Sequence, residues 1–396
     1  MASKRRRKRK KRSFFDTVDY SSFELIAPRC PHFGECGGCT FQNLSLDDQL
    51  SLKKTYLDRL FDQDVSVTAN PAPYGYRTRM DFVYAHGKLG LRKKGDFSTV
   101  IDITECHLLP PALHEVFLQV RSLLTERDIP SYDFLAHEGF LRYVVLRHAP
   151  GTGQIMVIFS TAACDDEAIL SRFRAMRREI ASCVTSVYWL VNDSMTDTSI
   201  IPDSTKEVFG APVIEDVIND TSLAISPYSF YQTNIAVTKL IFSRINEFVK
   251  GNVVDLCCGV GAIGLFVASQ ARSLTGIELV GDAVALARQN AASNDIDALF
   301  FEGDMKILDD IAPLEIDTLI VDPPRSGLSK KTIDRILSLA PDRIIYMSCN
   351  PKTQKLDRDA LTVDGQYEQI FLEGYDMFTH TPHVESLLVL DHILSS

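Results

Sequence analysis

The second half of the chain alternates short apolar runs with segments whose apolar residues recur at helical spacing. The short runs predict buried strands, and the amphipathic segments between them predict helices. Strands that are separated by helices form a parallel, doubly wound sheet. The strands predicted in this way are Val253–Cys257, Ser273–Glu278, Ala298–Glu302, Thr318–Val321 and Arg343–Met347, and the helices are Asn234–Val249, Gly261–Gln270, Gly281–Asn294, Lys330–Leu339 and Gln354–Leu361. Two last strands, Tyr367–Glu373 and Val384–Leu390, have only a loop between them and are predicted to form an antiparallel edge hairpin.

The first half of the chain has a different pattern. An amphipathic helix is predicted over Ser45–Phe61, and from about Tyr74 to Ile225 short alternating runs predict antiparallel strands. Helical patches interrupt these strands at Pro111–Arg127 and Asp165–Ala181. We therefore predict an α/β protein in three parts. These are an unpacked tail over residues 1–27, an α+β, β-rich domain over residues 28–225 and a Rossmann-like, doubly wound domain over residues 226–396.

Length and composition are those of a soluble globular protein. The chain has 396 residues, of which 45% are hydrophobic and 24% are charged. No run of 18 uncharged apolar residues is present, so we expect no transmembrane helix. The basic start is not followed by the apolar segment of a secretory signal. We expect a cytoplasmic protein without a membrane partner, and the sequence indicates no stable protein partner.

Positive charge is concentrated at one end of an acidic chain. The net charge is −10, yet nine of the 42 Lys and Arg residues lie between Lys4 and Arg12, with no acid among them. Repulsion keeps such a run solvated, and arms of this kind often bind nucleic acid. We interpret it as a polyanion-binding arm, with a simple solubility tail as the alternative.

A glycine-rich loop follows the first strand of the C-terminal half. Gly259, Gly261 and Gly264 join this strand to a helix, and Glu278 ends the next strand 19 residues after Gly259. The glycines allow a ligand to approach the backbone, and a carboxylate at that place accepts hydrogen bonds from ribose hydroxyls. A dinucleotide and S-adenosylmethionine both fit this pattern. Asp255, just before the loop, could face the positive sulfonium of S-adenosylmethionine, whereas it would repel a pyrophosphate.

Two later strands end in side chains that suit chemistry on an unreactive carbon. Asp322 precedes two prolines, and Cys349 ends the next strand. The ends of parallel strands project into the crevice where ligands bind. There an aspartate can hold a polar substrate edge, and a thiol with a lowered pKa can act as a nucleophile. A dehydrogenase has no use for these two groups.

Four cysteines have the spacing of a metal site. Cys30, Cys36 and Cys39 are crowded together, and Cys106 follows 67 residues after Cys39. Four thiolates suit zinc or an iron–sulfur cluster, and the spacing alone does not separate the two. An odd total of nine cysteines argues against a framework of disulfides.

Five motifs in order resemble those of the RNA uracil-C5 (5-methyluridine) methyltransferases. They are Phe230-Tyr-Gln-Thr-Asn234, Asp255-Leu-Cys-Cys-Gly-Val-Gly261, Asp322-Pro-Pro-Arg-Ser-Gly327, Ser348-Cys-Asn-Pro351 and His383-Val-Glu-Ser386. The resemblance implies that Cys349 is the nucleophile and Glu385 the general base. It also implies a pocket for S-adenosylmethionine and uracil that is lined by Gln232, Cys257, Gly259, Glu278, Asp304 and Asp322. Cys257 is a departure, because family members often have an aromatic residue there.

The resemblance also suggests a substrate and a second cofactor. The ribosomal branch of the family carries a [4Fe–4S] cluster on this cysteine spacing, so we predict a cluster held by the four thiolates and 23S ribosomal RNA as the substrate. The target uridine must then be flipped out or lie in a loop. The alternatives are the same reaction on transfer RNA, an NAD-dependent oxidoreductase, and an inactive RNA-binding protein that carries a cluster.

Basic residues interleaved with tyrosines lie near the strands of the first half. Arginine contacts phosphate, and tyrosine stacks on unpaired bases. We predict RNA contact for Arg77 and Arg79, with a solvated hairpin as the alternative. Further candidates for the same face are Tyr74, Tyr76, residues 92–94, Arg142, Arg147 and His148.

Overall fold

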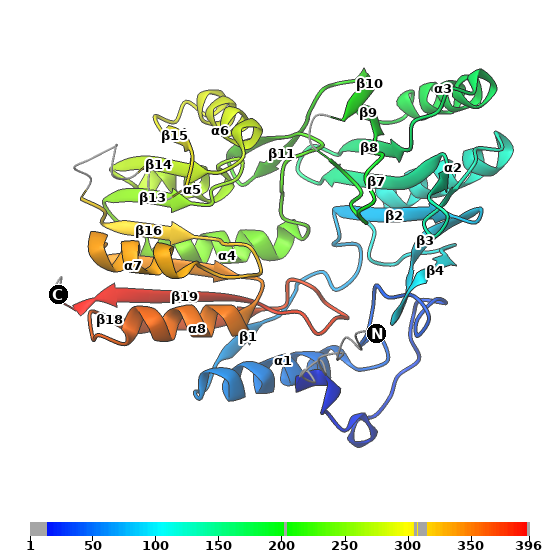
Figure 1. The fold of residues 1–396 in the computed structure, drawn as a ribbon. Coiled ribbons are helices and arrows are strands. Elements are labelled where there is room, and N and C mark those ends of the chain that lie inside the picture. Colours follow the sequence, from blue (N-terminus) through cyan, green and yellow to red (C-terminus); the bar gives the residue numbers. More distant parts are fainter. Residues whose placement is uncertain (1–13, 202–203, 305–306, 308–314, 394–396) are drawn as a thin grey trace, which may run out of the picture.

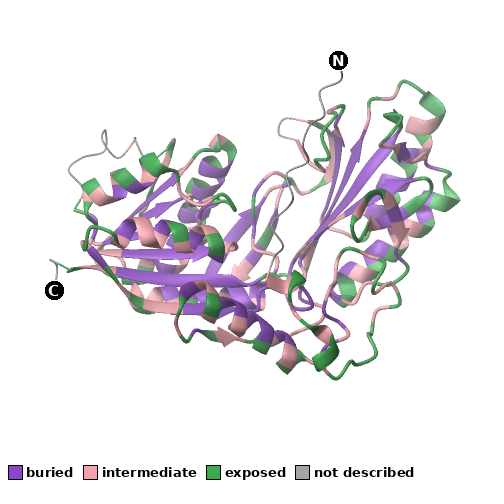
Figure 2. Ribbon diagram, turned by 60° about the horizontal axis from the view of Figure 1, so that its bottom comes forward, coloured by how far each residue is buried: buried purple, intermediate pink, exposed green. Residues whose placement is uncertain are grey.

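The computed structural model describes residues 14–201, 204–304, 307 and 315–393. Two large sheets lie side by side, each with its own helices (Figure 1). The central strands of both sheets are buried, whereas the outward faces of the helices are exposed (Figure 2). The predicted basic arm between Lys4 and Arg12 lies outside the described residues.

The C-terminal sheet has eight strands in the order β1-β18-β19-β17-β16-β13-β14-β15. Only β19 runs against its neighbours, so the sheet is mixed. The strands are β1 (Ser66–Thr68), β13 (Asn252–Leu256), β14 (Ser273–Glu278), β15 (Leu299–Glu302), β16 (Thr318–Val321), β17 (Arg343–Ser348), β18 (Tyr367–Tyr375) and β19 (Glu385–His392). The helices beside it are α1 (Leu46–Phe61), α4 (Ile235–Phe248), α5 (Ala262–Val267), α6 (Gly281–Ser293), α7 (Lys330–Leu339) and α8 (Pro351–Thr362).

Alternate residues of the central strands bury opposite faces of this sheet. Val253, Ile320 and Ile345 belong to one apolar cluster, which contains residues of α4, α5 and α6. Their neighbours Val254 and Leu319 belong to another, which contains residues of α7 and α8. Burial on both faces explains why these strands are continuous apolar runs without polar alternation. The predicted parallel, doubly wound core is therefore confirmed.

The predicted edge hairpin is present but does not lie at the edge. β18 and β19 pair antiparallel as expected, and β19 also pairs with β17. The outer side of β18 is covered by β1, which pairs with it in parallel from Ser66 to Thr68. Helix α1 packs next to it, against α8 and β18. A segment from the first half of the chain therefore completes the C-terminal sheet.

The second sheet has seven strands in the order β10-β9-β8-β7-β2-β3-β4. All its neighbouring pairs are antiparallel except β8 with β9. Its strands are β2 (Arg79–Ala85), β3 (Lys88–Lys93), β4 (Asp96–Asp102), β7 (Leu141–Ala149), β8 (Gln154–Thr161), β9 (Ser186–Val191) and β10 (Thr205–Gly210). Helices α2 (Pro111–Glu126) and α3 (Glu167–Ala181) share an apolar cluster with one face of this sheet. A small hairpin, β5 (Tyr132–Asp133) with β6 (Glu138–Gly139), lies beside it, and the other short elements are the 3₁₀ turns Phe14–Asp16, Tyr20–Ser22 and Ala268–Gln270.

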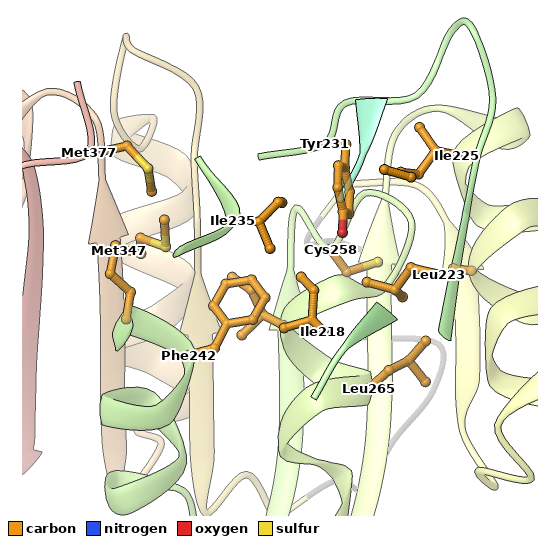
Figure 3. Packing of buried hydrophobic residues seen from close by; sticks show 14 of the residues in the cluster. Ile218, Leu223, Ile225, Tyr231, Ile235, Phe242, Cys258, Leu265, Met347 and Met377 are labelled. Atoms are coloured by element: carbon orange, nitrogen blue, oxygen red, sulfur yellow. The ribbon is translucent and has the colours of Figure 1, made fainter. Parts of the chain in front are cut away.

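The two sheets share one apolar core. A hairpin of β11 (Ile214–Ile218) and β12 (Thr221–Ile225) lies between them, and its apolar side chains join those of α4 and α5 (Figure 3). Tyr231 and Ile235 continue this cluster toward Met347 at the end of β17 (Figure 3). The predicted division of the chain at residues 225 and 226 stays a prediction. Tyr231 of the segment between β12 and α4 belongs to this shared core, so the core fixes that segment in place.

Candidate active site

The cysteine and the glutamate that were predicted to act together lie at the adjacent ends of two paired strands. Cys349 directly follows β17, and Glu385 is the first residue of β19. Ser348 pairs with Ser386 across these antiparallel strands, so the register continued by one residue places Cys349 opposite Glu385. The chain leaves the sheet here because Pro351 is the first residue of α8.

A buried glutamine holds these two strand ends together. The Gln354 Nε2 group donates to the Tyr346 carbonyl at 2.8 Å and to the Ser386 carbonyl at 3.2 Å. The Ser386 hydroxyl donates to the Gln354 Oε1 atom at 2.7 Å. Gln354 is fully buried. Its three bonds fix the strand ends directly beneath Cys349 and Glu385.

The electrostatics of the pair suit proton transfer. Burial raises the pKa of Glu385 well above the ordinary glutamate value, and the nearby Asp322 raises it further. A carboxylate with a raised pKa is a better base for a carbon-bound proton than an ordinary one. Burial and the charge of Glu385 also raise the pKa of Cys349, while a hydrogen bond from Arg325 and its positive charge lower it. Arg325 is thus the group that favours the thiolate.

Asp322 and Gln232 meet on another wall of the site. Asp322 follows β16, and burial raises its pKa to about 7. The Gln232 Nε2 group donates to an Asp322 carboxylate oxygen at 3.4 Å. A carboxyl and an amide side by side can accept from and donate to the polar edge of a pyrimidine.

Two side chains outside the cavity, Asp357 and Asn234, hold the segments that carry Asp322 and Gln232. Asp357 accepts from the Leu328 backbone N–H at 2.8 Å and from the Tyr346 hydroxyl at 2.6 Å, which anchors the loop after Asp322. The Asn234 side chain caps α4 and donates to the Met377 carbonyl at 3.0 Å. Sequence reasoning missed Gln354 and Asp357, because a polar residue on a helix gives no signal of what it contacts.

The glycine loop has the geometry of a nucleoside-binding turn. One oxygen of Glu278 accepts from the Gly259 backbone N–H and the other from that of Val280, both at 3.0 Å. Cys257 and Gly261 both have positive φ, at 65° and 82°. A side chain at Gly261 would come within 3.2 Å of the Phe300 ring. Glycine at this position allows the tight turn from strand to helix.

Asp255 has a different role from the one predicted for it. Its side chain is fully buried below the loop, and one oxygen accepts from the Gly264 backbone N–H at 3.0 Å. Burial raises its pKa to about 7. Asp255 does not line the cavity described next, so it does not face a ligand there. It stabilises the first turn of α5 instead.

A cavity of about 680 Å³ joins the two groups of residues. This volume lies within the range of small-molecule sites. All eight predicted catalytic and cofactor-binding residues line it: Gln232, Cys257, Gly259, Glu278, Asp304, Asp322, Cys349 and Glu385. Exposed apolar side chains that were not predicted also line it, namely Phe230, Leu279 and Val280. Leu279 and Val280 directly follow Glu278, and apolar groups there fit the adenine base of an adenosyl group whose ribose hydroxyls donate to the carboxylate.

The predicted iron–sulfur site is not supported. Cys30, Cys36, Cys39 and Cys106 do line one common cavity, but its volume is only about 20 Å³. Such a space has room for about one water molecule. Cys36, Cys39 and Cys106 are half-buried and pack against the apolar cluster that α2 and α3 share with the second sheet. Burial raises the pKa of Cys39 to about 12 and that of Cys106 to about 11. Among the described residues, no group of three or more His, Cys, Asp or Glu side chains could hold a metal ion.

Most of the residues predicted to contact RNA have partners within the protein. Arg79 forms a bidentate ion pair with Asp81, with both bonds at 2.9 Å. Arg142 and Arg147 are buried and donate to backbone carbonyls. Tyr76 is buried too. Lys93 and Lys94 are exposed, and Arg77, Arg92, His148 and Tyr74 are half-buried. Burial removes Tyr76, Arg142 and Arg147 from the predicted basic face, whereas RNA contact by Arg77 and Arg79 stays a prediction.

Fold and site together define an S-adenosylmethionine-dependent methyltransferase. Models of two protein families match the chain: "tRNA (Uracil-5-)-methyltransferase" over residues 304–393 and "Methyltransferase small domain" over residues 229–344. In the part of the chain that the structure describes, no helix is long and apolar enough to cross a membrane.

Relatives of known sequence and structure identify the family. An uncharacterized RNA methyltransferase of Caldanaerobacter subterraneus is 35% identical, over 95% of this chain and 87% of its own length. The tRNA (uracil(54)-C(5))-methyltransferase of Pyrococcus furiosus is 32% identical, over 91% of this chain and 84% of its own. The crystal structure of the Pyrococcus abyssi tRNA (uracil-54, C5)-methyltransferase with S-adenosyl-L-homocysteine has a TM-score of 0.77 at 31% identity, covering 89% of this chain and 85% of that one. The chain belongs to the RNA uracil-C5 methyltransferase family, whose reaction is S-adenosylmethionine-dependent methylation of uracil C5 in RNA.

Proposed function

We propose that this protein methylates C5 of a uridine in a transfer RNA. The observation that carries the chemistry is the placement of Cys349 opposite Glu385, with Asp322 in the same cavity. Support for the substrate comes from relatives named for transfer RNA, which match more than nine-tenths of this chain. These relatives favour transfer RNA over the 23S ribosomal RNA predicted from the sequence. Uridine 54, the position in their names, is the first to test.

The proposed mechanism begins with the thiol. Uracil C5 is a poor nucleophile, and addition of the Cys349 thiolate to C6 moves the electron pair of the C5–C6 double bond toward C5. Arg325 stabilises the thiolate before the addition. Asp322 and Gln232 hold the edge of the uracil ring, so that C6 faces the sulfur.

Glu278, Gly259, Cys257 and Asp304 would hold the cofactor, which supplies an electrophilic methyl group for C5 when it is bound. C5 of the resulting adduct carries both a hydrogen and a methyl group. The Glu385 carboxylate then removes this hydrogen as a proton. The electron pair of the C–H bond restores the C5–C6 double bond, the C6–sulfur bond breaks, and Cys349 leaves as a thiolate.

Transcripts that contain 5-fluorouridine test this chemistry. Fluorine at C5 cannot be removed as a proton, so the enzyme should remain covalently bound to a substituted transfer RNA in the presence of S-adenosylmethionine. A complex that survives denaturing electrophoresis is the expected result. Its absence, with wild-type protein that binds the cofactor, would overturn the proposed mechanism.

Mapping of 5-methyluridine tests the substrate. Transfer RNA and 23S ribosomal RNA from cells that lack this protein are each incubated with the purified enzyme and analysed by mass spectrometry. We expect methylation of transfer RNA at one position. Methylation of 23S ribosomal RNA alone would contradict the proposed substrate and support the one predicted from the sequence.

The iron–sulfur cluster remains a prediction, and no step above depends on it. The cysteine spacing and the common cavity of the four thiols support it, whereas their present arrangement could not hold a metal ion. Iron and sulfide are to be measured in protein purified without oxygen. Four iron atoms per chain that are lost in Cys39→Ser and kept in the control Cys183→Ser would support the cluster, and an iron-free wild-type protein would exclude it.

A further inference from the structure

The loop that precedes Glu385 is part of the active site and has no helix or strand of its own. It runs from Asp376 to Val384, between β18 and β19. Phe378 in this loop lines the cavity. The Met377 carbonyl accepts from the side chain of Asn234, which lies two residues after Gln232. The conformation of this loop therefore affects two walls of the site at once.

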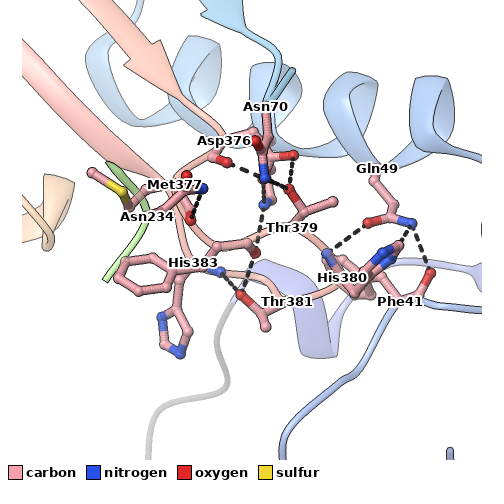
Figure 4. A network of polar contacts seen from close by, with 12 residues as sticks. Phe41, Gln49, Asn70, Asn234, Asp376, Met377, Thr379, His380, Thr381 and His383 are labelled. Carbon is pink, nitrogen blue, oxygen red and sulfur yellow. Dashed lines mark hydrogen bonds and ion pairs between the residues drawn. The ribbon is translucent and has the colours of Figure 1, made fainter. Parts of the chain in front are cut away.

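A buried ion pair between α1 and Asp376 holds the start of this loop, where Asp376, Thr379 and Asn70 lie close together (Figure 4). Lys53 in α1 pairs with Asp376, and the two side chains are 0% and 4% exposed. The Lys53 Nζ group also donates to the Phe378 carbonyl at 3.2 Å. The Thr379 hydroxyl donates to Asp376 at 2.8 Å and accepts from the Asn70 amide at 2.9 Å. Lys53, Asp376, Thr379 and Asn70 thus form one connected network of hydrogen bonds.

A second contact holds the middle of the loop, one helical turn earlier in α1. The Gln49 Oε1 atom accepts from the His380 backbone N–H at 2.9 Å, and its Nε2 group lies 3.2 Å from His380 Nδ1 (Figure 4). The same Nε2 group donates to the carbonyls of Phe41 and Leu44 at 3.0 Å. The His380 carbonyl in turn accepts from the backbone N–H groups of Thr40 and Phe41, at 2.7 and 2.9 Å.

Stability alone does not explain a buried pair of this kind. Removal of two charges from water costs free energy that their attraction often fails to recover, and apolar residues of the same size usually serve stability as well. A buried pair with complete hydrogen bonding does fix one geometry. Here the geometry that it fixes is that of the loop leading into Glu385.

We propose that Lys53 and Gln49 are positioning residues for the last step of the reaction, because they hold the loop that aims the Glu385 carboxylate at C5. This inference rests on the proposed function, in which Glu385 removes the C5 proton. Neither residue lines the cavity, so neither acts on the substrate directly. Their effect is on the step that needs Glu385, because both contact the loop that leads into Glu385, whereas Cys349 directly follows β17.

Two RNA substrates separate the steps. Trapping on 5-fluorouridine RNA needs Cys349 addition and methylation but no proton removal. Turnover on ordinary RNA needs all three steps. A variant that only misplaces Glu385 therefore traps normally, turns over slowly and accumulates the covalent adduct on ordinary RNA. A variant that is merely less well folded loses trapping and turnover together.

Three variants make the test. Lys53→Met combined with Asp376→Asn removes the ion pair without leaving a buried charge, and Gln49→Met removes the second contact while leaving the pair intact. The matched control is Arg177→Met combined with Glu207→Gln, which removes another pair with a fully buried arginine, at the β10 edge of the other sheet. Trapping rates and turnover are measured for all three under the same conditions.

We expect each test variant to keep the trapping rate within about twofold and to lose about 10- to 100-fold in turnover, the usual effect of misplacing a catalytic group. The control should keep both. If trapping and turnover fall equally in the test variants, or if turnover stays normal, the positioning role is wrong. Should the double variant fail to fold, Gln49→Met decides alone. If wild-type enzyme does not trap, the proposed function itself has failed.

Discussion

Replacement of Asp322 by asparagine is predicted to stabilise the protein while lowering its activity. Burial raises the pKa of Asp322 from 3.8 to about 7. Between these two pH values the folded protein binds a proton at Asp322 that the unfolded chain releases. Below pH 3.8 the carboxyl group is neutral in both states, so its burial does not lower the stability. As the pH rises from there toward 7, the charge that the unfolded chain acquires freely is increasingly unfavourable in the folded protein, and stability is lost. Asparagine has no charge to bury.

The size of the effect follows from the pKa. A rise from 3.8 to about 7 corresponds to about 4 kcal/mol at pH 8, at about 1.4 kcal/mol for each factor of ten. Because Asp322 is half-buried on an open cavity, water screens part of this cost, and we expect about 2 kcal/mol. With an unfolding entropy of about 2.1 cal/mol/K per residue, unfolding of the whole chain in one step gives a rise in Tm of about 2–3 °C.

Thermal unfolding at several pH values checks this prediction. The difference in Tm between Asp322→Asn and wild type should grow from pH 4 to pH 7 and change little above pH 7.5. The exposed Asp334 in α7 provides the control, since Asp334→Asn should give no such trend. A stabilisation that is equal at pH 4 and pH 8, or a loss of stability at both, would show that the carboxylate is not strained in the folded protein. Methyl transfer should fall in the variant at every pH, because an asparagine amide does not reproduce the hydrogen bonds of the carboxyl group to the uracil edge.

Three further substitutions test the site. Cys349→Ala should lower methyl transfer at least about 1000-fold, as expected for loss of a nucleophile. Binding of S-adenosylmethionine, measured by calorimetry, should stay within about twofold. Turnover near wild type, or an equal loss in the control Cys183→Ala, would refute the assignment. Glu385→Gln should leave a covalent enzyme–RNA adduct on ordinary RNA, visible on a denaturing gel, and normal product release would exclude Glu385 from the mechanism. Gln354→Leu should lower the free energy of unfolding by about 2–3 kcal/mol, because three buried polar groups lose a partner; unchanged denaturant unfolding would mean that the strand ends hold without it.

The C-terminal fold and the candidate site could be predicted because both depend on local order along the chain. Short apolar runs separated by amphipathic segments leave few arrangements other than a parallel sheet. The ends of such strands meet at one edge, so Glu278, Asp322 and Cys349 could be placed together before their contacts were known. Asp304 and Gln232 were placed by the resemblance to a family, since no periodicity points to them.

Other features could not be predicted, because they depend on contacts between distant segments. The sequence shows that Arg79, Arg142 and Arg147 are basic, but not that each faces a partner inside the protein. In the same way, nothing local shows that Lys53 reaches Asp376, more than 300 residues later. The spacing of Cys30, Cys36 and Cys39 predicts a cluster, whereas the way in which these thiols pack with Cys106 exists only in the folded chain.

The pairing of β1 with β18 has a consequence for the order in which this protein is made. Thr68 lies opposite Tyr375, so β1 has no strand partner until more than 300 further residues have been translated. The segment of α1 and β1 therefore reaches its final place only after β18 has been made. Because Lys53 and Gln49 of this segment contact the loop before Glu385, that loop is fixed only when two parts of the chain that are translated far apart have met.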